Sequence, residues 1–207
     1  DEYPSVVAWS SCPQKGILCL PLTYAPVSFR DEAIEVVKKR GCRTYGHHPV
    51  LEARHWGVIN GKDGDPAYHR THSCYSVAAF HEALRILLQH GREQKAVDYA
   101  YHEKALRRAV EAMGCEVSSN MTSLVVLNLP GKLAGLEKDL VAKCREENFG
   151  IWPTLSSPVQ VRIGILNQLN QEAIADIAGR FADAMLKMGA SFKKEEVMQE
   201  LAEYFSS

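Results

Sequence analysis

Helical periods alternate with short apolar runs over the second half of the chain. Apolar residues recur at helical spacing before Gly91, before Gly114 and after Asn170, whose side chain is typical of a helix N-cap. Between these segments, the runs 122–129 and 159–163 have the length and β-branched content of strands. From Gly91 onward the order is therefore helix, strand, helix, strand, strand, helix, which indicates helices packed against a small sheet.

The last segment, from about Lys193 to Phe205, has the pattern of an amphipathic helix. Its apolar positions Val197, Leu201 and Phe205 fall on one helical face. That face has two possible contacts, and the sequence leaves both open. It packs either on the rest of this chain or on a partner.

The first forty residues have a different pattern. Three apolar runs, at 6–9, 17–20 and 25–29, read as short strands, and a helix capped by Asp31 follows them. Strands that are apolar on both faces belong inside a larger, covered sheet. No helices precede these strands to cover a second face. We therefore expect residues 1 to about 40 to be the tail of a larger domain whose other part this chain lacks.

A long stretch without period, residues 42–73, separates the two patterns. Prolines and glycines interrupt it, and Asn60-Gly61 is a strong turn signal. A loop of this length inside a compact chain is usually functional. We divide the chain after this loop and the helix that follows it. Residues 1–90 are then the tail of the large domain with the loop and an interdomain helix, and residues 91–207 are a small α/β domain with a terminal helix.

Composition and charge exclude several function classes. The 207-residue chain is 46% hydrophobic and 24% charged, as folded globular proteins are. Its 24 Lys and Arg residues against 25 Asp and Glu residues give a formal net charge of −1, which leaves no basic excess to bind nucleic acid. No apolar run approaches the roughly 20 residues of a membrane span, and the first residues lack a signal-peptide pattern. We therefore expect neither a nucleic-acid nor a membrane partner, and a location in the cytoplasm or in an organelle.

Cysteine and histidine spacing argues against a metal site. The six cysteines are scattered without a CxxC pair, which favours reduced, mostly buried thiols over a zinc site or a disulfide scaffold. Several histidines gather between positions 47 and 72, and His69 and His72 stand three residues apart. No acidic or cysteine ligand lies at a recognised spacing from them. We therefore expect no bound metal.

Lys15 is the first candidate for chemistry. It lies in Ser11-Cys12-Pro13-Gln14-Lys15-Gly16, between the first and second apolar runs. Poor solvation lowers the pKa of an amine and makes it a nucleophile for carbonyl groups. On these residues alone, an ordinary solvated loop lysine remains the alternative.

Arg162 is the second candidate, in Val161-Arg162-Ile163-Gly164-Ile165-Leu166. A planar guanidinium pairs with a carboxylate through two parallel hydrogen bonds and fixes its orientation. Taken alone, the residue is equally an exposed charge at the edge of a sheet.

Both segments have counterparts in a known family. The segment 11–18 resembles the Ser-Gly-Ser-Gln-Lys-Ala-Leu stretch of class V aminotransferases, and 161–166 resembles their Leu-Arg-Ile-Gly-Leu-Leu motif. Between them, Tyr-His-Arg-Thr at 68–71 resembles the family's Tyr-His-His-Thr element. The segments follow the family's order, and the resemblance extends from Val6 to about Met188. The family includes alanine–glyoxylate and serine–pyruvate aminotransferases, which are pyridoxal-phosphate (PLP) enzymes of fold type I.

The resemblance implies a fold and a reaction. The fold is α/β, the C-terminal part of fold type I, with the end of the large PLP-binding domain in 1–90 and the small domain in 91–207. The reaction transfers an amino group from an amino acid to a 2-oxo acid such as glyoxylate or pyruvate, with pyridoxal 5'-phosphate as cofactor. The assembly is a homodimer, or a hetero-oligomer with a chain that supplies the N-terminal half.

The resemblance also implies the roles of individual residues. Lys15 is the catalytic residue, because the family's lysine at this position holds the cofactor covalently and moves the α-proton. Gln14 beside it contacts the cofactor. Tyr68 and Thr71 reach across the dimer to the partner's cofactor phosphate, and Arg162 binds the α-carboxylate of the substrate.

Some features depart from the family pattern. Leu20-Pro21-Leu22 stands where the family has Pro-Pro-Gly, and the segment 153–158 replaces the glycines before the arginine motif. The family's first half, with the aspartate that pairs with the pyridine nitrogen, has no counterpart in this chain, so we do not expect the chain alone to be a competent enzyme. It is either a C-terminal portion or subunit that needs a complementary N-terminal part, or a noncatalytic subunit that stabilises or regulates a partner chain. A lyase or desulfurase of the same fold, with Cys12 near Lys15, is a third interpretation.

Overall fold

In the computed structural model of the protein, the chain forms two compact units, with the boundary between Arg85 and Ile86. The division falls inside helix α4 (Cys74–His90). Each unit is described by itself below. The described residues are 5–11, 26–40, 73–155, 159–166 and 169–207.

The first unit contains a two-stranded ribbon and a helix. Strand β1 (Ala8–Ser10) pairs antiparallel with β2 (Val27–Phe29), with Trp9 opposite Ser28. Helix α2 (Asp31–Arg40) follows, and the acidic residues of its first turn suit the positive end of the helix dipole. Trp9 is 50% exposed.

Three predictions for this unit are confirmed. Strand β1 overlaps the apolar run at 6–9, strand β2 lies within the run at 25–29, and a helix begins at Asp31. The run at 17–20 and the long loop at 42–72 lie outside the described residues.

The second unit is built on a four-stranded antiparallel sheet with the strand order β3-β4-β6-β5. The strands predicted near 122–129 and 159–163 are confirmed as the two central ones. The sequence pattern did not reveal β3, because a two-residue strand is too short to show a period. The four strands are β3 (Glu116–Val117), β4 (Leu124–Asn128), β5 (Trp152–Pro153) and β6 (Val161–Gly164).

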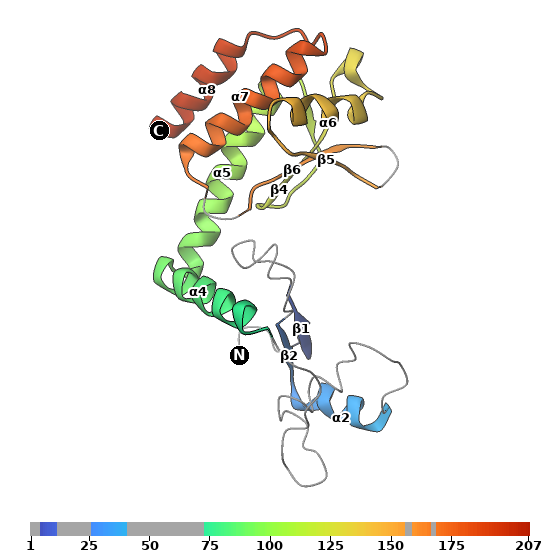
Figure 1. The fold of residues 1–207 in the computed structure, drawn as a ribbon, viewed down its shortest axis with the longest axis vertical. Coiled ribbons are helices and arrows are strands. Elements are labelled where there is room, and N and C mark those ends of the chain that lie inside the picture. The colour runs from blue at the N-terminus through green and yellow to red at the C-terminus, as the bar shows by residue number, and fades with distance from the viewer. Residues whose placement is uncertain (1–4, 12–25, 41–72, 156–158, 167–168) are drawn as a thin grey trace. The chain divides into compact units, whose positions relative to one another are not determined.

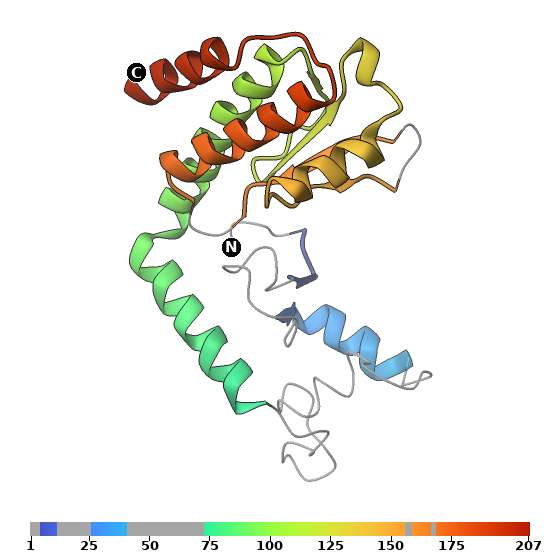
Figure 2. The ribbon, with the colours of Figure 1, turned by 45° about the horizontal axis from the view of Figure 1, so that its top comes forward.

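Helices cover one face of this sheet (Figures 1 and 2). The side chains of Val125 and Leu127 on β4, and of Val161 and Ile163 on β6, are buried toward the helices. Their neighbours in sequence lie on the opposite face, because successive side chains of a strand alternate. The helices are α5 (Arg92–Ala112), α6 (Glu137–Glu146), α7 (Gln171–Lys187) and α8 (Lys194–Ser206), with a short 3-10 turn at Gly131–Leu133.

The helix boundaries follow local signals. Gly91 has a φ of 93° and Gly114 a φ of 85°, which is left-handed backbone that favours glycine at the ends of α4 and α5. The Oδ1 atom of Asn170 accepts a hydrogen bond from the backbone N–H of Ala173 at 2.9 Å. The predicted helix ends and the predicted N-cap are therefore confirmed.

The apolar face of α8 packs on the rest of the chain. Val197 and Leu201 are 2% and 1% exposed, and α8 lies against α5 and α7. Near its C-terminus, the ring of Tyr204 stacks on that of Tyr101, with ring centroids 5.1 Å apart. Of the two possible contacts, the intramolecular one is confirmed. No helix in the described part of the chain is both long and apolar enough to cross a membrane.

Candidate functional site

Arg162 is the predicted site residue that the structure describes. Lys15, Gln14, Tyr68 and Thr71 lie outside the described residues. The geometry therefore bears on the carboxylate-binding end of the candidate site, and the cofactor-binding residues stay predictions from the sequence.

Strand β6 presents Arg162 on the face of the sheet opposite the helices. Its neighbours in the strand, Val161 and Ile163, are buried against the helices, and Arg162 itself is exposed. Val126 on β4 and Trp152 on β5 are its cross-strand partners, so both share its face. Because β6 lies between β4 and β5, Arg162 is an exposed charge on a central strand and not at the edge of the sheet.

The guanidinium of Arg162 makes no hydrogen bond or ion pair with another described residue. Other arginines of the second unit are paired: Arg107 lies 2.6 Å from the carboxylate of Glu103, and Arg180 lies 2.7 Å from that of Asp176. A guanidinium without a described counter-ion, on a face that the helices leave open, is suited to binding a carboxylate from outside.

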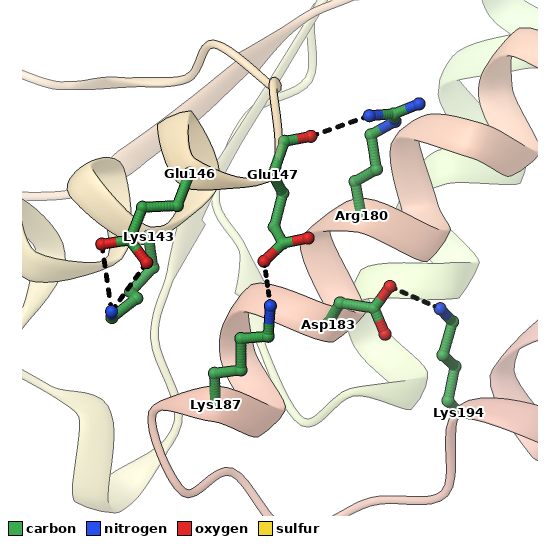
Figure 3. Close-up of polar contacts among 7 residues, drawn as sticks. All are labelled: Lys143, Glu146, Glu147, Arg180, Asp183, Lys187 and Lys194. Carbon is green, nitrogen blue, oxygen red and sulfur yellow. Dashed lines mark hydrogen bonds and ion pairs between the residues drawn. The ribbon is translucent and has the colours of Figure 1, made fainter.

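The helices of this unit carry a separate group of charges that bond to one another (Figure 3). The carboxylate of Glu147 pairs with Lys187, and its backbone carbonyl accepts a hydrogen bond from Arg180 at 2.8 Å. Lys194 at the start of α8 lies 2.6 Å from Asp183 on α7. These contacts join the end of α6 to α7, and α7 to α8, so these charges serve the packing of the helices.

Trp152 forms an aromatic border beside Arg162. Trp152 is 58% exposed, and the guanidinium of Arg145 lies over its ring at 5.5 Å from the ring centroid. Sequence analysis did not assign Trp152 to the site. Its position directly opposite Arg162 becomes visible only through the pairing of β5 with β6.

A polar ladder borders Arg162 along the strands. Gln160 is two residues before Arg162, and its Nε2 atom donates hydrogen bonds to Ser118 Oγ and to Asn128 Oδ1, both at 2.9 Å. The Nδ2 atom of Asn128 in turn donates to Glu116 Oε2 at 3.3 Å. Sequence analysis missed these residues, although the spacing of Gln160 and Arg162 around a buried valine already indicated a shared face.

Two thiols of this unit are buried in its hydrophobic core. Cys115 and Cys144 are buried free thiols, and burial raises the pKa of each to about 12. Neither is therefore a nucleophile near neutral pH.

Within the described ranges, no three His, Cys, Asp or Glu residues gather as metal ligands do. The histidines between 47 and 72 lie outside those ranges.

His102 on α5 is a buried titratable group, only 9% exposed. Helix α5 packs against β3 and β4 as well as against α7 and α8, and His102 lies among its buried positions. Desolvation lowers the pKa of His102, which favours the neutral ring.

No family model matches the sequence, and no curated protein matches it. Solved structures do match. The chain is similar to ureidoglycine–glyoxylate aminotransferase from Bacillus subtilis, with a TM-score of 0.79 and 17% identity over 98% of this chain and 52% of that one. It is similar to pyridoxamine–pyruvate aminotransferase from Mesorhizobium loti, with a TM-score of 0.78 and 16% identity over 99% of this chain and 53% of that one. A C-DES mutant with glycine covalently linked to its PLP cofactor matches with a TM-score of 0.63 and 16% identity, over 88% of this chain and 47% of that one.

These similarities show the fold. The chain has the mixed α/β fold of about half of a PLP-dependent aminotransferase, so the predicted fold class is confirmed. It spans about half the length of each of these matched chains, which is consistent with a C-terminal half.

Proposed function

We propose that this chain is the C-terminal portion of a PLP-dependent aminotransferase and acts together with a complementary N-terminal part. The observation that carries the proposal is Arg162, an exposed guanidinium without a described partner on the open face of an aminotransferase-like sheet. The share of the matched aminotransferases that the chain spans, 52% and 53%, supports the need for a second part.

The side chains assigned by the motif resemblance fit the cofactor chemically. Lys15 offers an amine for a carbonyl carbon, and Gln14 offers an amide. Tyr68 and Thr71 offer hydroxyl donors of the kind that bind phosphate oxygens. When bound, PLP supplies an electron sink for the charge that develops at the substrate Cα.

The steps of the reaction assign one task to each residue. Arg162 binds the substrate α-carboxylate through two N–H···O bonds and so fixes the direction of the Cα–H bond. The Nζ atom of Lys15 removes that proton as general base and returns it as general acid. Water would release the first 2-oxo acid and leave the amino group of the amino acid on the bound cofactor. A second 2-oxo acid would then take up that group as the steps run in the opposite direction. Small acceptors such as glyoxylate or pyruvate are proposed, in line with the names of the matched aminotransferases.

The assembly is part of the proposal. Tyr68 and Thr71 donate to a phosphate held by the partner protomer, so a homodimer or a hetero-oligomer completes the site. The competing function, a noncatalytic subunit, keeps the fold and the assembly but holds no cofactor at Lys15.

One experiment separates these two functions. Intact-mass spectrometry of the native preparation first detects any second chain. The preparation is then incubated with PLP and reduced with borohydride, and peptide mass spectrometry locates the reduced adduct. The aminotransferase predicts a reduced adduct on Lys15, which is lost in Lys15→Ala and kept in the matched control Lys193→Ala, a lysine at the start of α8 that pairs with Glu196. An assembly without any adduct on Lys15 would contradict the enzyme and favour the noncatalytic subunit.

A further inference from the structure

Gln160 and Arg162 lie on the same face of the sheet beside each other. They are two residues apart, with the fully buried Val161 between them, so their Cα atoms are about 7 Å apart. The backbone of Gln160 is fixed on the β5 side: its N–H donates to Thr154 Oγ1 at 2.9 Å, and its carbonyl accepts from the Thr154 N–H at 2.7 Å. The side chain of Gln160 therefore starts from a fixed point next to the candidate carboxylate site.

The orientation of the Gln160 amide is set from both ends of the ladder. The carboxylate of Glu116 requires the Nδ2 atom of Asn128 on its side, which turns Asn128 Oδ1 toward Gln160. The hydroxyl of Ser118 donates to the carbonyl of Val126 at 3.2 Å, so its oxygen is left to accept. Both neighbours of the Gln160 amide thus present acceptors, and the amide must present its Nε2 atom to them.

This arrangement leaves the Oε1 atom of Gln160 as an acceptor. Both hydrogens of Nε2 are engaged, and no described residue donates to Oε1. Gln160 is half-buried, and its amide oxygen can accept a hydrogen bond from a ligand that carries a donor.

We propose that Gln160 is a specificity-determining residue, whose Oε1 accepts a hydrogen bond from the side chain of a substrate bound through its carboxylate to Arg162. The proposal rests on the proposed function of Arg162. It favours amino acids with a short hydroxyl or amide side chain, because these carry a donor. It disfavours acidic side chains, because they offer only acceptors and approach the carboxylate of Glu116 at the end of the same ladder.

The test compares pairs of amino acids of similar shape. The full chain, with any polypeptide that co-purifies with it, is titrated with L-asparagine and L-leucine, and with L-serine and L-2-aminobutyrate, by ligand-observed NMR. We expect the preference for the donor-bearing member to fall about fivefold in Gln160→Met, as the loss of one hydrogen bond predicts. Gln199→Met is the matched control, since Gln199 lies on α8 and bonds to Glu203 there, and we expect it to leave both preferences unchanged.

A second variant, Ser118→Ala, tests the same role of Gln160 in case Gln160→Met does not fold. Ser118→Ala removes one of the two acceptors that hold the Gln160 amide, and we expect a smaller loss of preference, about twofold. The preference for the donor-bearing amino acid is compared in the unaltered chain, Gln160→Met and Ser118→Ala. If it is the same in all three, the role of Gln160 is overturned, but the carboxylate site at Arg162 is not. Arg162→Gln tests the proposed function separately: if it leaves the binding of all four amino acids unchanged, or if the unaltered chain binds none of them, both the carboxylate site and this inference fail.

Discussion

Arg162 lies directly opposite Trp152 in the pairing of β6 with β5, on the face of the sheet that the helices leave open. The pair combines a charged donor with an apolar border. In the proposed function, a substrate carboxylate on Arg162 would have Trp152 on the neighbouring strand and Gln160 two residues before Arg162 in the same chain segment. An aromatic ring and an amide are chemically different surroundings, so the proposed site would distinguish between the substituents of an amino acid.

Replacing Arg162 by lysine tests the carboxylate site. Lysine keeps the positive charge but loses the planar fork, so we expect Arg162→Lys to weaken amino-acid binding about tenfold. The unfolding free energy changes by less than about 0.5 kcal/mol, because Arg162 is exposed and has no described partner to lose. Calorimetric titration and urea denaturation measure the two effects. A large loss of stability with unchanged binding would mean that Arg162 is structural.

Packing of α8 on the body is tested by a pair of matched leucine substitutions. Leu201 is 1% exposed in the core between α8, α5 and α7, so we expect Leu201→Ala to lower the unfolding free energy by about 2–5 kcal/mol. Leu155 is 100% exposed, and Leu155→Ala removes the same atoms without leaving a cavity. Chemical denaturation followed by far-UV circular dichroism measures both. Equal stability of the two variants would show that α8 does not pack on the body in solution.

The helices of the second unit were predictable from the sequence because their boundaries are local. Gly91 and Gly114 end helices in left-handed backbone, and Asn170 bonds to the N–H three residues later. Each signal acts within one turn of helix and needs no knowledge of the tertiary structure. The apolar spacing then fixes which face of each helix is buried.

The surroundings of Arg162 were not predictable in the same way. Gln160 meets Ser118 across a separation of 42 residues, and it meets Asn128 across 32. Such contacts depend on the register in which β3, β4 and β6 pair, and a two-residue strand leaves no periodic signal. Sequence analysis found the arginine through a motif, but the residues beside it come from strand pairing. Residues outside the described ranges, Lys15 among them, stay predictions.

Burial of His102 predicts a pH dependence of stability. Its pKa is lowered in the folded chain by desolvation, so between the unfolded pKa near 6.5 and the folded pKa the unfolded chain binds more protons. The contribution of His102 is therefore fully present above about pH 6.5 and is lost as the pH falls, with a slope of at most about 1.4 kcal/mol per pH unit.

The matched variants for this prediction are His102→Gln and His81→Gln, a substitution at an exposed position of α4. Denaturation curves at pH 7, 6 and 5 should show a shallower loss of stability for His102→Gln than for the unaltered chain. His81→Gln should keep the original slope. An unchanged slope in His102→Gln would mean that His102 is solvated in the folded chain.

Thiol reactivity provides a test of the core that needs no substitution. Cys74 is exposed, whereas Cys115 and Cys144 are buried and each has a pKa raised to about 12 by burial. The thiolate is the reactive form, so at pH 8 we expect iodoacetamide to modify Cys74 at least tenfold faster than either buried thiol. Peptide mass spectrometry over time measures each rate, and labelling in guanidinium chloride is the control that should equalise them. Modification of Cys115 or Cys144 at the rate of Cys74 in the folded protein would show that the core between the sheet and the helices opens readily.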